Sequence, residues 1–343
     1  MAPHAAILGT GLIGASLGIA LRSVGWEVAG WDPDDLRLGA ALQMGAVDRM
    51  AAGIDDAVSG SDLVALAGPV PAIIETLRGL RTDALVTDVG GVKVPVLEAG
   101  RHLRRFVPGH PMAGRETSGP AGASGSLFRG ATWVLVDDEA GGDDLEAVGR
   151  IVQSLGADPV RMDAAAHDAA VAAASHLPHV TAAALVGLVG DDERAMALAA
   201  GGFRDLTRIA MSDPSWWIDV LVANRGPVVE ELRALAERLA GLATRIEHAD
   251  REGLEHVLVQ ARTVRSAMAP PVAGVGVILE DRPGEIAAVG HALAVSHVDL
   301  RDLQLRHATH GGGGVLTLSV RADEAEALRL ALREEGFRLV ETV

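Results

Sequence analysis

The 343-residue chain contains no cysteine and no tyrosine, and Lys93 is its single lysine. The absence of cysteine excludes disulfides, thiolate metal sites and cysteine nucleophiles. The absence of tyrosine means that no phenol can act as a catalytic acid. Every fixed side-chain cation other than Lys93 is therefore an arginine.

Positive charge is also scarce, because 30 basic residues stand against 46 acidic ones, for a net charge of -16. This argues against nucleic-acid binding, since phosphate recognition needs clustered cations. It does not exclude a small anionic substrate, because a few local arginines can serve one site. We find neither a charged N-terminal segment followed by a cleavage site nor a membrane-spanning apolar run. A cytoplasmic enzyme without a membrane segment is therefore expected.

Changes in composition and in the spacing of apolar residues divide the chain into three expected domains. Residues 1–165 alternate short apolar runs with helical stretches, which is typical of a parallel, doubly wound Rossmann sheet. Residues 166–268 are rich in alanine and leucine at helical spacing, which predicts an all-helical domain. Its segments are too apolar to be stable alone, so we expect this domain to form a homodimer. Residues 269–343 begin with a proline-rich linker and predict a ferredoxin-like β-α-β-β-α-β domain.

The strands expected in the parallel sheet are short apolar runs that end near glycine, proline or aspartate. They are residues 5–8, 27–31, 63–67, 84–88, 106–108 and 132–136.

A G-x-G-x-x-G motif follows the first expected strand and opens a helix. Gly9 permits the tight turn, Gly11 lets a pyrophosphate approach the backbone, and Gly14 allows close packing of helix and strand. Asp32 ends the second strand, where a carboxylate can bond both ribose hydroxyls and repel a 2′-phosphate, so NAD is favoured. The nearby Arg37 leaves NADP open. The expected cofactor-binding residues are Gly9, Gly11, Leu12, Ile13, Gly14 and Asp32.

His110 follows an expected strand at the carboxyl edge of the sheet, where open α/β folds bind ligands. An imidazole there can take the proton of a carbinol while hydride leaves for a nicotinamide, and its ordinary pKa near 6.5 suits a base at neutral pH. Position alone is equally compatible with a structural histidine that caps the loop before Pro111.

Arg208 lies in a mostly apolar helical stretch, where a guanidinium needs a partner. A bidentate contact with a substrate carboxylate would supply one. An internal salt bridge to Asp205 or Glu116 is the alternative.

His176 and His179 are three residues apart, on one face of an expected helix. The spacing could suggest a metal pair. No cysteine and no obvious third ligand accompany it, so we expect no metal.

Four further segments carry a joint pattern. They are Asp88-Val-Gly-Gly-Val-Lys93; Gly109-His-Pro-Met-Ala-Gly-Arg-Glu-Thr-Ser-Gly119 with Leu127-Phe-Arg-Gly130; Ser175-His-Leu-Pro-His179; and Gly202-Phe-Arg-Asp-Leu-Thr-Arg-Ile-Ala210 with Ser212-Asp-Pro214, Trp217 and Asn224. Their order and spacing resemble the prephenate and arogenate (cyclohexadienyl) dehydrogenase family. The resemblance implies NAD-dependent oxidative decarboxylation of prephenate to 4-hydroxyphenylpyruvate, on the route to tyrosine.

The resemblance also implies roles for single residues. His110 matches the family's catalytic histidine, which bonds the ring hydroxyl at C4. The residues implied in substrate binding are Ser175, His179, Arg208, Glu116 and Trp217, with Arg204, Asp205, Arg208 and Glu116 forming an ionic network at the mouth of the site. His167 stands either near the site or at a solvated helix start, and Lys93 either orders the nicotinamide side or caps a helix.

Gly91 departs from the pattern, because the family often has serine there. That hydroxyl supports the catalytic histidine, and a water can take its place. Arogenate and 4-amino-4-deoxyprephenate therefore stay open as alternative substrates.

Residues 280–286 resemble the D-R-P-G-x-[LI] turn of ACT domains, which bind amino acids at their interfaces. This implies tyrosine as a feedback inhibitor, although an ACT-like fold that only dimerises stays open. A β-hydroxyacid or 6-phosphogluconate type dehydrogenase would need a catalytic lysine in the helical domain, and residues 166–268 contain none. An NAD-sensing regulatory protein is the non-enzymatic alternative, against which His110, His179 and Arg208 together argue.

Overall fold

The computed structural model describes residues 2–114, 119–138, 141–267, 272–280, 282–307 and 313–340. The chain divides into two compact units, Met1–Glu237 and Arg238–Val343. The boundary falls within the long helix α12 (Arg225–Glu247), and we describe each unit by itself. The division into residues 1–165, 166–268 and 269–343 stays a prediction.

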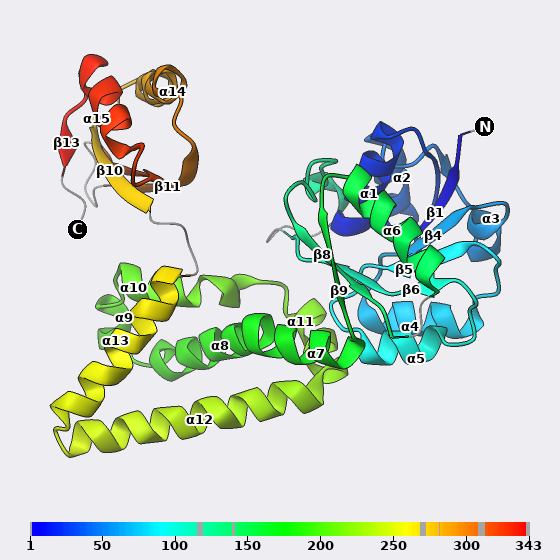
Figure 1. Cartoon of the computed structure of the whole chain (residues 1–343), viewed down its shortest axis with the longest axis horizontal. Helices are drawn as coiled ribbons and strands as arrows, with labels where there is room; N and C mark the ends of the chain where they lie inside the picture. Colours follow the sequence, from blue (N-terminus) through cyan, green and yellow to red (C-terminus); the bar gives the residue numbers. More distant parts are fainter. Residues whose placement is uncertain are drawn as a thin grey trace. The chain divides into compact units, whose positions relative to one another are not determined.

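The first unit is built on a six-stranded parallel sheet with the strand order β3-β2-β1-β4-β5-β6 (Figure 1). Its strands are β1 (His4–Leu8), β2 (Glu27–Trp31), β3 (Arg49–Met50), β4 (Leu63–Leu66), β5 (Leu85–Asp88) and β6 (Phe106–Val107). The helices between them are α1 (Leu12–Ser23), α2 (Asp35–Gln43), α3 (Ile54–Val58), α4 (Val70–Gly79) and α5 (Val94–Gly100). The strand order reverses between β1 and β4, where sheets of this kind bind ligands. This confirms the predicted Rossmann-like domain.

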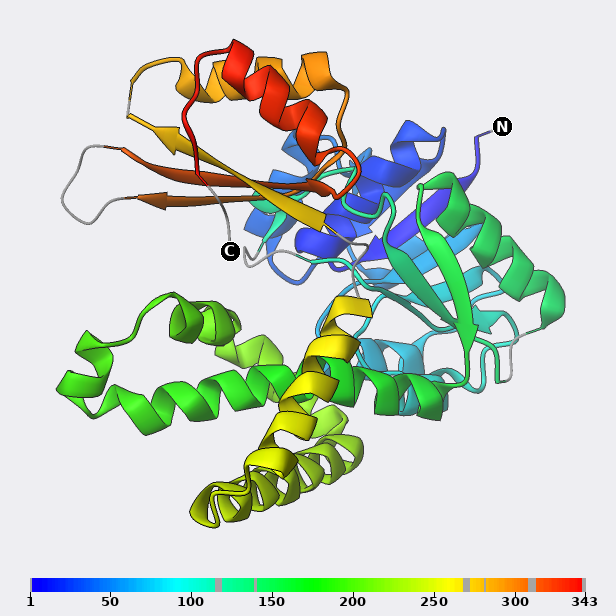
Figure 2. The same cartoon turned by 60° about the vertical axis from the view of Figure 1, so that its left-hand side comes forward.

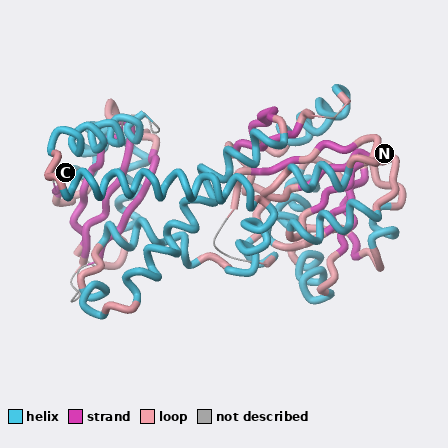
Figure 3. Tube along the Cα trace, turned by 90° about the horizontal axis from the view of Figure 1, so that it is seen from below, coloured by secondary structure: helices cyan, strands magenta, loops and turns pink. Residues whose placement is uncertain are grey.

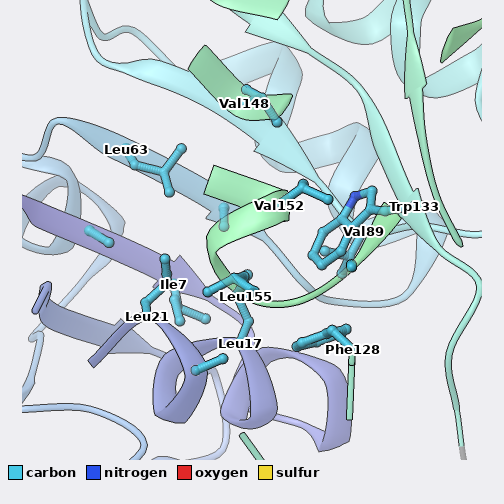
Figure 4. Packing of buried hydrophobic residues seen from close by; sticks show 14 of the residues in the cluster. Ile7, Leu17, Leu21, Leu63, Val89, Phe128, Trp133, Val148, Val152 and Leu155 are labelled. Carbon is cyan, nitrogen blue, oxygen red and sulfur yellow. The ribbon is translucent and has the colours of Figure 1, made fainter. Parts of the chain in front are cut away.

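Both faces of the sheet are buried, because successive residues of a strand point to opposite sides. Ile7 of β1 packs with Leu21 of α1 and Leu155, which follows α6 (Gly142–Ser154), as Figure 4 shows. Leu8 faces the other way and joins a cluster that includes Ile73 of α4. Figure 3 shows the strands of this unit flanked by helices. Continuous apolar strands are what a sheet covered on both faces requires.

One expected strand does not join the parallel sheet. Residues 132–136 form β8 (Thr132–Val136), the centre of a separate three-stranded sheet with β7 (Gly109–Pro111) and β9 (Asp158–Met162). Only Pro108 separates β6 from β7, and β7 runs antiparallel to β8. The sequence predicted the strand correctly but its sheet wrongly, since an apolar run does not specify its partner.

The short 3-10 segment η1 (Pro120–Gly122) lies between β7 and β8, and from Ala164 onward the described part of the unit is helical, with one π and one 3-10 segment. Its elements are α7 (Ala164–Val171), η2 (Ala172–His176), α8 (Leu177–Gly190), α9 (Glu193–Ala197), α10 (Gly201–Thr207), η3 (Arg208–Met211), α11 (Pro214–Ala223) and the first part of α12.

The elements α7, η2 and α8 form one continuous helix, Ala164–Gly190. Its middle is a π turn, in which the Leu177 N–H bonds the Ala172 carbonyl. Pro178 has no N–H to offer, which favours such an irregularity. Among the described helices, this one alone is long and apolar enough to span a membrane by length and composition, although 28% of its apolar window is buried. No apolar run of this length is predicted from the sequence. The core helices of soluble proteins can have the same length and composition.

The second unit contains the end of α12, the helix α13 (Arg251–Ala267) and an antiparallel sheet of order β11-β12-β10-β13. Its other elements are β10 (Val272–Leu279), α14 (Glu285–Ser296), β11 (Leu300–His307), β12 (Gly314–Arg321), α15 (Ala325–Glu334) and β13 (Leu339–Val340). Both α14 and α15 lie on one face of this sheet (Figure 2, orange and red). Its core includes Val277, Leu318 and Leu328. Asp281 of the predicted effector turn lies outside the described residues.

Candidate active site

The glycine-rich loop has the geometry that a dinucleotide needs. Gly9 has φ +103°, and a Cβ at Gly14 would lie 1.9 Å from the Gly9 carbonyl oxygen. A Cβ at Gly11 would meet no described heavy atom within 4 Å, so the backbone there is open. Gly11 is also the N-cap of α1, so Leu12 and Ile13 begin a helix without a side-chain cap. An anion fits this helix N-terminus, because its first N–H groups and its dipole favour negative charge.

Asp32 directly follows β2 and is buried. Its Oδ2 accepts hydrogen bonds from the Thr10 N–H at 2.7 Å and from the Thr10 hydroxyl at 3.2 Å. Its Oδ1 accepts from the Asp34 N–H at 3.0 Å and lies 3.5 Å from Arg37 Nη1. The carboxylate therefore ties the end of β2 to the glycine-rich loop, a contact with Thr10 that the sequence did not reveal.

His110 lies on β7 and is linked to the helical region by a chain of hydrogen bonds. Its Nδ1 lies 2.8 Å from His167 Nε2, and His167 Nδ1 lies 2.8 Å from Asp168 Oδ1. The same carboxylate accepts from the backbone N–H groups of Lys93 at 2.7 Å and Val94 at 2.9 Å. Asp168 therefore caps α5 from a distant helix and ends the chain that starts at His110.

Lys93 forms a buried ion pair just behind β7. Its Nζ lies 2.5 Å from Asp88 Oδ2 and 2.6 Å from the carbonyl oxygen of Gly109. The Asp88 carboxylate also accepts from the Gly90 N–H at 2.8 Å and the Gly109 N–H at 3.1 Å. Burial raises the pKa of Asp88 and lowers the pKa of Lys93, and their mutual attraction opposes both shifts. Lys93 thus stands at the N-cap of α5, but its ammonium holds the end of β5 against the residue before His110.

The surroundings of His110 favour its neutral form. Burial lowers the pKa of His110 well below 6.5, and the charge of Lys93 and the neighbouring His167 and His176 act in the same direction. A neutral imidazole can accept a proton, as a general base must.

A second group of rings lies on the continuous helix and α11. His179 stacks on Trp217, with ring centroids 3.7 Å apart and planes 10° apart, and His176 meets Trp217 edge-on at 6.0 Å. Both imidazoles thus face one side, as their spacing predicts. The Nδ1 of His179 is buried without a hydrogen-bond partner among the described residues. An unpaired buried nitrogen is costly, so it marks a position where a bound polar group would contribute.

Asn224 joins this group to the His110 chain. Its Nδ2 donates to the Asp168 carbonyl at 2.8 Å and to His176 Nδ1 at 3.1 Å. Burial lowers the pKa of His176 to about 4. The structure therefore brings His110, His167, His176 and Asn224 together, from elements far apart in the sequence.

The remaining predicted residues lie as follows. Ser175 is partly buried within the π turn, and Trp217 is partly exposed. Arg208 begins η3 and is exposed, and its role in substrate binding stays a prediction. Glu116 lies outside the described residues.

Sequence reasoning left His167 undecided and missed Asp168. A signal was present, because these two neighbours form a polar pair within an alanine-rich stretch. Both side chains are almost fully buried, at 1% and 2% exposure. A buried polar pair needs hydrogen-bond partners, and here the partners come from other elements.

Two family models match the chain. The nucleotide-binding domain of prephenate dehydrogenase matches residues 17–160, and the dimerization domain of prephenate dehydrogenase matches residues 163–260. Neither model reaches the residues from 272 onward.

Individual proteins give the same picture. The chain is 29% identical to the prephenate dehydrogenase of Bacillus subtilis over 341 residues, covering 93% of this chain and 92% of that protein. It is 31% identical over 284 residues to the cyclohexadienyl dehydrogenase of Zymomonas mobilis, covering 77% of this chain and 96% of the relative. The solved structure of A. aeolicus prephenate dehydrogenase in complex with hydroxyphenyl propionate and NAD+ superposes with a TM-score of 0.72. The identity is 28%, over 78% of this chain and 99% of that one.

Proposed function

The chain belongs to the prephenate dehydrogenase family and is an NAD-dependent oxidoreductase, and we propose that it converts prephenate to 4-hydroxyphenylpyruvate and carbon dioxide. The observation that supports this best is His110. Its Nδ1 forms a hydrogen bond with His167. Its Nε2 points toward Gly91, where a Cβ would lie 3.8 Å away, and Gly91 has no side chain to fill that space. The base therefore presents one nitrogen to a substrate and keeps the other bonded.

The residues of the chain divide the work. NAD, when bound, accepts the hydride that leaves C4 of the cyclohexadienol ring. The open backbone at Gly11 and the N-terminus of α1 would hold its pyrophosphate, and Asp32 would bond the ribose hydroxyls. His110 Nε2 accepts the proton of the C4 hydroxyl as the hydride leaves. The ring carboxylate then departs as carbon dioxide, and aromatisation drives the step, so positioning and charge placement are the main tasks of the protein.

We assign the substrate contacts to the second group of rings and to Arg208. The unpaired His179 Nδ1 offers a polar contact beside the face of Trp217. Prephenate is a dianion, and the guanidinium of Arg208 can bind one of its carboxylates in a bidentate manner. Ser175 and Glu116 complete the predicted contacts.

The test is turnover by the purified full-length chain. Prephenate, arogenate and 4-amino-4-deoxyprephenate are supplied separately with NAD, and formation of NADH and carbon dioxide is followed. We expect the highest kcat/KM with prephenate. Faster turnover of arogenate or of the amino analogue would overturn the substrate assignment, and no NADH with all three would overturn the activity.

We also propose that the helical region forms a homodimer. Several large apolar side chains are exposed on it, among them Leu188, Leu206 and Ile218. A monomeric soluble chain seldom exposes so many without a partner. A monodisperse monomer at micromolar concentration in sedimentation would exclude the dimer.

We propose that residues 269–343 form an ACT domain that binds tyrosine as a feedback inhibitor. The order of elements from β10 to β13 and the resemblance of residues 280–286 support it. A chain ending at residue 269 should lose tyrosine inhibition, whereas unchanged inhibition would put the effector site elsewhere. A cytoplasmic location stays a prediction.

A further inference from the structure

Behind His110, three side chains form one line of hydrogen bonds that crosses from β7 to α7. His110 Nδ1 lies 2.8 Å from His167 Nε2, and His167 Nδ1 lies 2.8 Å from Asp168 Oδ1. His110 and His167 are 57 residues apart in the sequence, so only the fold brings them together. The proposed function uses Nε2 of His110 and assigns no role to the hydrogen bonds from its Nδ1 to His167 and Asp168.

The far end of the line has a fixed direction. The Asp168 carboxylate already accepts from the N–H groups of Lys93 and Val94, which hold it in place at the start of α5. An ionised carboxylate can only accept, so His167 Nδ1 must carry a hydrogen. Because a neutral imidazole has one N–H, His167 Nε2 is then a lone pair.

The direction passes on to His110. Since His167 Nε2 accepts, His110 Nδ1 must be the donor, and its own hydrogen sits there. The Nε2 of His110 is therefore unprotonated, which is the form that can take a proton from a substrate hydroxyl. The carboxylate at one end thus dictates the tautomer at the other.

We propose that His167 and Asp168 are positioning residues, which hold His110 in the tautomer with a free Nε2 and stabilise the imidazolium that forms when Nε2 accepts the substrate proton. The proton stays on His110 Nε2 until the product's phenolate oxygen takes it back, and the Nδ1–H of His110 donates to His167 throughout. The role in turnover rests on the proposed function, whereas the tautomer does not.

Such support is needed because the other neighbours of His110 oppose its protonation. Lys93, which is ion-paired with Asp88, and His176 of the continuous helix both disfavour a positive charge on His110. Among the groups that face this imidazole, Asp168 is the carboxylate reached through a hydrogen-bonded ring. The line therefore offsets part of the cost of placing a second cation beside Lys93.

The tautomer can be measured directly in the wild-type chain. Histidine is labelled with ¹⁵N, two-bond proton–nitrogen couplings report which ring nitrogen carries hydrogen, and the His110→Asn variant assigns the His110 signals. We expect His110 and His167 both to carry hydrogen on Nδ1. A hydrogen on His110 Nε2 in the neutral enzyme would overturn the proposal, whether or not the chain turns over prephenate.

The kinetic test compares two changes at His167. His167→Phe keeps a ring but removes both nitrogens, and His167→Gln keeps an oxygen that can accept from His110. We expect Phe to lower kcat on the order of tenfold to a hundredfold with little change in either KM, as loss of the group that orients a functional histidine does elsewhere. Gln should recover part of the loss.

Asp168 is less suited to substitution, because it also caps α5 and its loss would disturb the fold. The control is His102→Phe, which makes the same change of side chain at a histidine that bonds the Leu80 carbonyl and lies beyond the other end of α5. His102→Phe should keep the wild-type kcat. If His167→Phe folds and also keeps it, the proposal is wrong; if it does not fold, the tautomer measurement decides.

Discussion

Gly91 faces the Nε2 edge of His110. A Cβ added to Gly91 would lie 3.8 Å from that nitrogen and 4.0 Å from Val220 Cγ2, and both are ordinary contact distances. A small side chain therefore fits beside the base without displacing it. Residue 91 itself offers no side chain to bond the substituent at C4 of the substrate. The choice between a hydroxyl and an amino group at C4 therefore depends on other groups.

Gly91→Ser tests that relationship. The new hydroxyl would come within reach of His110 Nε2 and of a hydroxyl at C4, and one net hydrogen bond changes an equilibrium by about twofold to tenfold. We expect kcat/KM for prephenate to rise by that factor relative to the C4-amino analogue. Gly91→Ala adds the same bulk without the hydroxyl, so equal behaviour of Ser and Ala would count against a role for this hydrogen bond.

Replacement of the base should lower turnover sharply. His110→Asn removes the group that accepts the hydroxyl proton, and loss of a general base costs about 10²–10⁴-fold. The drop should appear in kcat, measured with saturating prephenate and NAD, while the dissociation constant of NAD stays close to that of the wild type. Near-normal turnover would show that His110 is not the base.

Arg208→Ala should have a different kinetic signature. A contact with a carboxylate exists in both ground state and transition state, so KM should rise more than kcat falls. Arg208→Lys keeps the charge without the bidentate geometry, so its KM should lie between those of the wild type and Arg208→Ala. An unchanged KM for prephenate and arogenate would restrict Arg208 to the internal ionic network.

Asp32→Ser should weaken NAD binding and narrow the preference over NADP. The change removes the carboxylate that repels a 2′-phosphate and that holds the Thr10 N–H. It also frees Arg37, which lies 3.5 Å from that carboxylate, to bind the phosphate. Adding Arg37→Ala should remove the gain in NADP use, measured as the ratio of kcat/KM values. A wild-type chain that is faster with NADP at equal concentration contradicts the argument.

Acid should destabilise the first unit through His176. Its pKa falls from 6.5 to about 4 in the folded chain, and its Nδ1 accepts from Asn224, so protonation sets two donors against each other. A lowered pKa contributes stability above pH 6.5 that is lost as pH falls toward 4, here about 3 kcal/mol at most. All five tryptophans lie in Met1–Glu237, so their fluorescence reports urea unfolding of this unit. His176→Gln should lose less unfolding free energy than the wild type between pH 6.5 and 4. Equal losses would show that His176 is not the group responsible.

Much of the fold follows from local features of the sequence. The spacing of Gly9, Gly11 and Gly14 after an apolar run predicts a turn that only glycine fits, and the structure has φ +103° at Gly9 and a clash for any Cβ at Gly14. Buried strands and helical faces were likewise predictable, because side-chain periodicity is a local property. The same locality led to the error at β8, whose apolar pattern is the same in either sheet.

The sequence by itself determined the cofactor loop, the histidine at the strand end and the family to which they point. Only the tertiary structure decided which groups support that histidine. His110 meets His167 because β7 and α7 pack together, and Lys93 is buried against Asp88 and Gly109 rather than exposed at a helix start. Hydrogen bonds between residues so far apart depend on how the elements pack, and a linear pattern contains no information on the direction in which a buried side chain turns.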